Sequence, residues 1–144
     1  MAALSVREAR PDDAAAIAGL IRELGYDVTD HEVAARLQLL GERREPPLLA
    51  DLDGVVGCLT WHVMHVLHRP RPVGRITMLV VAPDVRSRGI GAALVEAAEA
   101  RLRQAGCGLV EVTSNMKRAD AHRFYLKLGY EQTSFRFARS LTEG

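Results

Sequence analysis

The stretch from residue 76 to residue 104 constrains the fold most, because it joins a buried strand to a helix through a short basic loop. Residues 76–82 are a mainly apolar run rich in β-branched side chains, which is typical of a buried strand. Pro83 ends that run. Downstream, apolar residues recur at helical spacing from Gly89 to about Gln104, at Ile90, Leu94, Ala97, Ala98 and Leu102. A strand followed directly by a helix predicts an α/β protein.

The loop itself, residues 86–92, has the composition of an anion-binding turn. The first N–H groups of a helix have no intrahelical partner, and the helix dipole adds partial positive charge there. Gly89 and Gly91 have no Cβ atom, so a ligand can approach the backbone closely, while Arg86 and Arg88 offer donors that suit phosphate. The stretch has neither GxGxxG nor GxxxxGK before Ser or Thr, so dinucleotide and triphosphatase loops are not indicated. Two interpretations stay open, a pyrophosphate cradle and an ordinary strand-to-helix turn with two solvated arginines.

One motif is Leu-Val-Val-Ala-Pro at residues 79–83, followed by Arg86-x-x-Gly89-x-Gly91 and a helix. A second begins with Asn115 after a predicted strand and continues as Ala-His-x-Phe-Tyr-x-x-Leu-Gly-Tyr over residues 121–130. The first resembles the acyl-CoA-binding core of the GNAT superfamily of N-acetyltransferases, and the second resembles the same superfamily's second motif. Together the motifs cover about residues 75–131, and the pair is far more specific than either motif alone.

The resemblance implies an enzyme that transfers an acetyl or other short acyl group from acetyl-CoA to a small-molecule or peptide amine, without a metal. Attack of an amine on a thioester builds negative charge on the carbonyl oxygen, which a correctly aimed backbone N–H stabilises. The position that matches this donor in the superfamily is Leu79. The residues implied to bind CoA lie on the strand, in the loop and in the second motif: Leu79, Val80, Val81, Arg86, Ser87, Arg88, Gly89, Ile90, Gly91, Ala92, Asn115 and Tyr125.

Tyr125 occupies the superfamily's general-acid position, from which it would give a proton to the leaving thiolate. With reference pKa values of about 10 for tyrosine and about 8.5 for a thiol, that transfer is uphill by roughly 2 kcal/mol, which is small beside an enzymic barrier. The alternative is that Tyr125 only packs or hydrogen-bonds the cofactor sulfur. Asn115 likewise fits both a contact to the pantetheine arm and an ordinary turn.

The general base is the least defined part of the predicted site. Many members of the superfamily carry a carboxylate on the fourth strand, where this chain has Arg75, Thr77 and Met78. A primary amine with a pKa near ~10.4 is mostly protonated at pH 7, and freeing it costs about 4.6 kcal/mol, so a proton acceptor is desirable. Three residues are candidates: Glu111, His62 and His65. A water chain would remove the need for any of them, and the missing carboxylate also motivates a second hypothesis, a non-catalytic acyl-CoA sensor or interaction domain.

The remaining patterns predict a mixed sheet with helices on both faces, in the order β-α-α-β-β-β-α-β-α-β. Further strands are predicted at residues 4–9, 48–52, 55–66, 109–113 and 133–140, and further helices at 14–24, 30–40 and 119–128. Thr29 and Glu32 have the spacing of a capping box, and Asp53-Gly54 predicts a tight hairpin turn. Residues 68–75 form a basic connector punctuated by prolines. Tyr26, between the first two helices, either faces a substrate or packs at the helix junction.

Length, charge and cysteine content limit the class of protein. The 144 residues predict one domain over residues 1–144, and a net charge of +1 makes a nucleic-acid-binding module a distant third hypothesis. Neither a leader pattern nor a membrane-spanning stretch is recognised, which predicts a cytoplasmic protein with no membrane contact. Cys58 and Cys107 form no disulfide or metal pattern, and His62 and His65 would point to opposite faces of a strand, which disfavours a metal triad. A homodimer through the final strands is expected from the resemblance alone.

Overall fold

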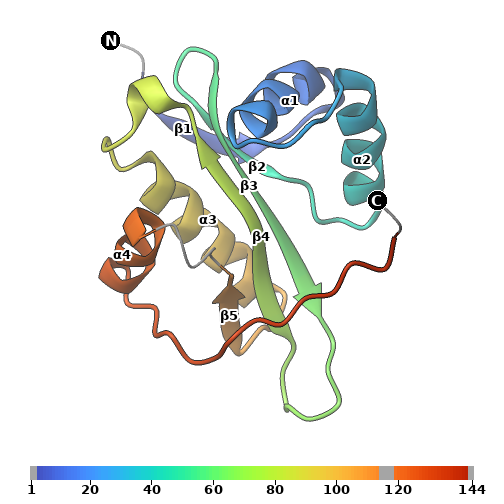
Figure 1. The fold of residues 1–144 in the computed structure, drawn as a ribbon, viewed down its shortest axis with the longest axis vertical. Coiled ribbons are helices and arrows are strands. Elements are labelled where there is room, and N and C mark those ends of the chain that lie inside the picture. The colour runs from blue at the N-terminus through green and yellow to red at the C-terminus, as the bar shows by residue number, and fades with distance from the viewer. Residues whose placement is uncertain (1–2, 114–118, 143–144) are drawn as a thin grey trace. The chain divides into compact units, whose positions relative to one another are not determined.

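The computed structural model describes residues 3–113 and 119–142 (Figure 1). The chain divides into two compact units, Met1–Val112 and Thr113–Gly144. The first unit contains β1 (Ser5–Glu8), η1 (Pro11–Asp13), α1 (Ala14–Glu23), α2 (Asp30–Glu42), β2 (Leu48–Asp51), β3 (Val55–Met64), β4 (Val73–Val81), η2 (Pro83–Val85), α3 (Ile90–Gln104) and β5 (Leu109–Val112). The second contains α4 (Ala119–Lys127). In the part of the chain that the structure describes, no helix is both long and apolar enough to cross a membrane.

A five-stranded mixed sheet forms the centre of the first unit, with its strands in the order β1-β2-β3-β4-β5. The first four strands pair antiparallel, and β5 runs parallel to β4. Asp53 and Gly54, with φ angles of 57° and 127°, make the turn between β2 and β3, as the hairpin pattern predicted. The predicted α/β architecture with a mixed sheet is therefore confirmed.

Helices cover both faces of this sheet, with α1 and α2 on one face and α3 on the other (Figure 1). Two neighbouring residues of β3, Gly57 and Cys58, point to opposite faces of the sheet, because successive positions of a strand alternate. Cys58 packs into the cluster beneath α1 and α2. At Gly57 an added Cβ atom would lie 3.1 Å from Cδ1 of Leu94 on α3. The glycine thus lets α3 approach the sheet closely.

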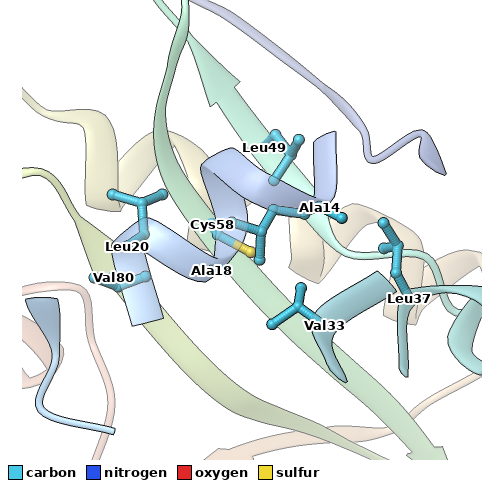
Figure 2. Packing of buried hydrophobic residues seen from close by; sticks show 9 residues of the cluster. Ala14, Ala18, Leu20, Val33, Leu37, Leu49, Cys58 and Val80 are labelled. Carbon is cyan, nitrogen blue, oxygen red and sulfur yellow. The ribbon is translucent and has the colours of Figure 1, made fainter. Parts of the chain in front are cut away.

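The core beneath α1 and α2 consists of small and branched apolar side chains from both helices and three strands (Figure 2). Its buried members are Ala14, Ile17, Ala18, Leu20, Val33, Leu37, Leu49, Cys58 and Val80. The second helix is held at its start by the predicted capping box: Thr29 Oγ1 accepts from Glu32 N–H at 3.1 Å, and Glu32 Oε1 accepts from Thr29 N–H at 3.0 Å. Local capping and a shared apolar core together fix this layer.

Two sequence-based expectations are wrong. Residues 133–140 form no strand, and Phe135 and Phe137 are 79% and 93% exposed. Alternation marks a segment that is able to form a strand, but a strand also needs a partner edge, and none pairs with these residues in the described chain. The connector predicted at 68–75 is also too long, because β4 already starts at Val73. The preceding residue, Pro72, accepts a hydrogen bond at its carbonyl oxygen from Gly108 N–H at 3.0 Å.

Candidate active site

The glycine loop forms a left-handed turn immediately before α3. Ser87 and Gly89 have φ angles of 68° and 78°, and Gly89 is the N-cap residue of the helix with no side chain capping it. The first helical hydrogen bond runs from Ala93 N–H to Gly89 O at 3.0 Å, so the amides of Ile90 to Ala92 precede the helical ladder. Unpaired amides and the positive end of the dipole make this loop a suitable site for an anion.

The two arginines of the loop are exposed, and one of them connects the loop to β4. Arg86 Nε donates to Val81 O at 3.2 Å. Arg88 is exposed beside Gly89. Both guanidinium groups therefore lie on a chain segment whose backbone also favours negative charge.

Beside the loop, the second half of β4 has an edge with no strand partner in the described residues. β5 pairs with β4 only from Val73 to Ile76. Ala82 N–H bonds to Val56 O on the β3 side at 2.8 Å, so by alternation the N–H groups of Leu79 and Val81 point to the opposite, open edge. This edge offers backbone donors and acceptors to an extended ligand.

A β-bulge lies where the open edge begins. Thr60 pairs with Met78 and Trp61 pairs with Ile76, so Thr77 is an extra residue in β4. Its Oγ1 lies 2.6 Å from Oγ1 of Thr60 on β3. The extra residue interrupts the alternation of β4, so the side chains after the bulge point to the faces opposite to those that an unbroken alternation from Val73 would give them.

A row of polar side chains crosses three strands on the face of the sheet that α1 and α2 cover. His62 on β3 is opposite Arg75 on β4, and Arg75 is opposite Glu111 on β5. Paired residues of neighbouring strands share a face, and His62 lies four residues from Cys58 of the α1 core, which identifies that face. Arg75 Nη1 lies 3.3 Å from Glu111 Oε1. The structure thus brings together two of the three predicted base candidates.

The His62 side chain has a buried partner that the sequence did not suggest, Glu45 in the loop before β2. Glu45 Oε1 lies 2.8 Å from His62 Nδ1, and Oε2 accepts from Val63 N–H at 2.8 Å. Glu45 is one of two buried charged residues among those described; the other, Asp13, is paired with Arg7. The only local signal at Glu45 is a carboxylate before two prolines, which indicates a loop but not this contact.

The other predicted site residues lie in different places. His65 is exposed beyond the end of β3, and Tyr26 is 63% exposed in the loop between α1 and α2. Tyr125 lies on α4 in the second unit, in edge-to-face contact with Phe124 and Tyr130 at 5.1 and 5.7 Å between ring centroids. Asn115 lies outside the described residues.

Both cysteines are free thiols, Cys58 buried and Cys107 partly buried. Burial raises the pKa of the Cys58 thiol to about 12, and it also raises the pKa of Cys107. No group of three or more potential metal ligands occurs among the described histidines, cysteines and carboxylates.

Comparison with known proteins assigns the chain to a family. The model of the Acetyltransferase (GNAT) family matches residues 14–130. The chain belongs to the GNAT family of acetyltransferases. Its glycine loop and open β4 edge therefore lie in a GNAT fold, as the two sequence motifs predicted.

Curated relatives of this GNAT chain are named as N-acetyltransferases. The aminoalkylphosphonate N-acetyltransferase of Salmonella typhimurium is 39% identical over 98% of this chain and 94% of its own length. An aminoglycoside N(6')-acetyltransferase of Stenotrophomonas maltophilia is 30% identical over 90% of this chain and 87% of its own length.

Solved structures show the same GNAT fold. An aminoglycoside N-acetyltransferase in complex with CoA superposes with a TM-score of 0.88 at 18% identity, covering 99% of this chain and 97% of its own. A putative acetyltransferase from Agrobacterium tumefaciens has a TM-score of 0.85 at 25% identity, covering 94% and 99%. Family and relatives together establish that the chain is an acyl-CoA-dependent N-acetyltransferase with acetyl-CoA as co-substrate, and they do not favour a non-catalytic sensor.

Proposed function

We propose that acetyl-CoA lies along the open edge of β4 with its diphosphate at the glycine loop. The pantetheine amides would pair with the backbone of Leu79 and Val81, on either side of Val80, as an added strand does. The N–H groups from Ser87 to Ala92, with Arg86 and Arg88, would hold the diphosphate. The left-handed Gly89 and the unpaired edge beyond Ile76 support this placement. Asn115 is assigned to the pantetheine arm from the family motif alone.

The reaction in this proposal is direct attack of a primary amine on the thioester carbonyl, through a tetrahedral intermediate. The Leu79 N–H would stabilise the oxyanion, since it points to the open edge. Tyr125 would protonate the leaving thiolate, a role that rests on its place in the family motif.

His62 is the general base in this proposal, and its buried carboxylate partner is the observation that favours it. Glu111 is in an ion pair with Arg75, whereas His62 is bonded to Glu45 through Nδ1, which leaves Nε2 available to accept a proton. His62 is three residues along β3 from Leu59, the residue opposite Leu79, so the backbones of the base and of the oxyanion donor are about 10 Å apart along the strands and about 4.8 Å, one strand spacing, apart across the sheet. A small acceptor amine, with or without one bridging water, fits that separation.

For the acceptor, we propose a small primary amine that carries an acidic group. The Salmonella relative is named for aminoalkylphosphonates, and Arg75 lies directly beside His62 in the polar row. A guanidinium group binds a phosphonate or carboxylate through two parallel hydrogen bonds. The acidic group would share Arg75 with Glu111 while the amine reaches toward the thioester. Tyr26, exposed in the loop between α1 and α2, is a second candidate for a contact to the acceptor.

Thiol release from acetyl-CoA tests this proposal. We expect kcat/KM for 2-aminoethylphosphonate to exceed that for propylamine at least tenfold, and Arg75→Gln to remove most of the difference. Arg22→Gln, which breaks the 3.2 Å ion pair with Asp30 on the same unit, is the matched control and keeps the preference. Equal rates with the two amines, or a preference for an aminoglycoside, contradict the proposed acceptor class.

The proposal also includes a cytoplasmic location, a homodimer and no nucleic-acid partner. Free thiols and a CoA-linked substrate suit a reducing compartment, and a net charge of +1 gives no general attraction to nucleic acid. The exposed, alternating Phe135 and Phe137 support pairing of the final segment with another copy. The molecular mass of the purified protein, measured by light scattering, distinguishes a dimer from a monomer.

A further inference from the structure

We propose that Glu45 is a positioning residue that holds the proton of neutral His62 on Nδ1 and so presents Nε2 as the open acceptor. The inference rests on the proposed role of His62 as the base. It concerns a residue that neither the sequence motifs nor the proposed cofactor site includes.

The two oxygens of Glu45 have different partners, and this difference fixes the carboxylate. Oε2 accepts from the backbone N–H of Val63 at 2.8 Å, and Oε1 faces His62 Nδ1 at 2.8 Å. A backbone amide is always a donor, and an ionised carboxylate only accepts. His62 Nδ1 must therefore carry the proton in this contact, because two acceptors do not form a hydrogen bond.

The loop that carries Glu45 is anchored on both sides of the residue. Glu45 N–H donates to Leu40 O at 3.0 Å at the end of α2, and Arg44 has a φ of 59°. Pro46 O accepts from Trp61 Nε1 at 2.8 Å. Trp61 is buried and precedes His62 on β3, so the same strand holds both the loop and the imidazole. A buried, anchored acceptor is suited to orienting a catalytic ring.

The exposure of the pair has the asymmetry that this role needs. The Glu45 side chain is 11% exposed, whereas the His62 side chain is 45% exposed. The other charged groups facing His62 across the sheet are Arg75 on β4 and, beyond it, Glu111 on β5. The proton that leaves the amine nitrogen of the substrate would pass to Nε2 of His62, and the imidazolium would keep donating its Nδ1–H to Glu45.

Glu45→Gln tests the inference with almost no change in shape. The amide oxygen must face Val63 N–H, since the opposite orientation would bring two donors together in a buried site. The amide NH2 group then faces His62 Nδ1 and donates to it, which moves the ring proton to Nε2. Long-range 1H–15N correlation spectra distinguish the two neutral tautomers, and the His62 signals are those lost in His62→Ala.

We expect the Nδ1–H tautomer in the unmodified chain, the Nε2–H tautomer in Glu45→Gln, and no change in Glu42→Gln. Glu42 is the matched control because it is an exposed carboxylate, bonded to Gln38, at the end of α2 just before the loop that carries Glu45. kcat/KM of Glu45→Gln should fall roughly a hundredfold, as on loss of a general base. The same substitution in a His62→Ala background should cause no further loss, because Glu45 acts through His62.

The tautomer alone decides the inference, whatever the activities are. An Nε2–H tautomer of His62 in the unmodified chain overturns it, and this measurement needs His62→Ala only to assign the His62 signals. An unchanged tautomer in folded Glu45→Gln, judged by its melting curve, overturns it as well. If the tautomer changes as expected but His62→Ala retains full activity, the base assignment fails while the effect of Glu45 on His62 stands.

Discussion

A Cβ atom added to Gly74 of β4 would lie 2.6 Å from Cδ1 and 2.7 Å from Cδ2 of Leu102 on α3. Leu102 is fully buried, so the leucine has no solvent-facing direction in which to move. The close approach of α3 to this part of the sheet thus depends on the absence of one methyl group. Pairing of β4 with β5 begins in the same region.

We predict that Gly74→Ala lowers the free energy of unfolding by about 1–3 kcal/mol, because the added methyl group overpacks the core. Urea denaturation followed by circular dichroism measures the change. Gly19→Ala is the control: this residue lies within α1 with open space around it, and alanine should stabilise the helix by roughly 0.5–1 kcal/mol. A Gly74→Ala variant as stable as the unmodified chain would show that α3 moves aside freely.

Gly89 and Gly106 provide a matched pair at the two ends of α3. Both have positive φ angles, of 78° and 86°, and open space where a Cβ atom would lie. Alanine should therefore cost about 1 kcal/mol of stability at either position. We predict that only Gly89→Ala weakens CoA binding, by about tenfold or roughly 1.4 kcal/mol in calorimetry, because only Gly89 shapes the proposed diphosphate loop. Equal CoA affinities of the two variants would argue against that loop.

Tyr125 and Tyr130 provide a second matched pair, because their rings lie in edge-to-face contact in the second unit. Tyr125→Phe removes the proposed proton donor and keeps the ring, so turnover should fall at least tenfold while CoA affinity changes little. Tyr130→Phe removes a neighbouring hydroxyl and should leave turnover close to that of the unmodified chain. Steady-state thiol release and calorimetry give the two quantities. Unchanged turnover in Tyr125→Phe rejects the general-acid assignment.

Arg7 connects three parts of the first unit and makes stability depend on pH. Its guanidinium group bonds both oxygens of Asp13, at 2.9 and 3.0 Å, and Asp51 at 3.1 Å. The hydrogen bonds from Arg7 lower the pKa of Asp13, and the bonds from Gly54 N–H and Arg7 lower the pKa of Asp51. A carboxyl whose pKa is lower in the folded than in the unfolded chain stabilises the fold above the unfolded pKa of about 3.9.

We therefore predict that the free energy of unfolding falls as the pH drops below about 4, as these carboxylates become protonated. The destabilisation caused by Asp13→Asn should be large at pH 7 and should shrink as the pH falls through the folded pKa of Asp13. Urea denaturation at a series of pH values measures both chains. A difference between them that stays constant down to the acid limit would exclude this source of the pH dependence.

The sequence alone determined the features that depend on residues close together in the chain. Thr29 and Glu32 satisfy each other's backbone amides within one turn, and Asp53-Gly54 adopts the left-handed conformations of a hairpin. The strand, glycine loop and helix from Ile76 to Gln104 were likewise predictable, because backbone preference and apolar period act over a few residues. These motifs were also sufficient to indicate the GNAT family.

Only the tertiary structure decided which side chains meet in the polar row. His62 and Arg75 face each other because of the register of β3 on β4, and Glu111 joins them through a parallel pairing. Glu45 lies 17 positions before His62 and reaches it through the loop into β2. Residues 133–140 have the alternation of a strand but no strand partner among the described residues. Such contacts depend on which edges of the folded chain come together, and local patterns carry no information about that choice.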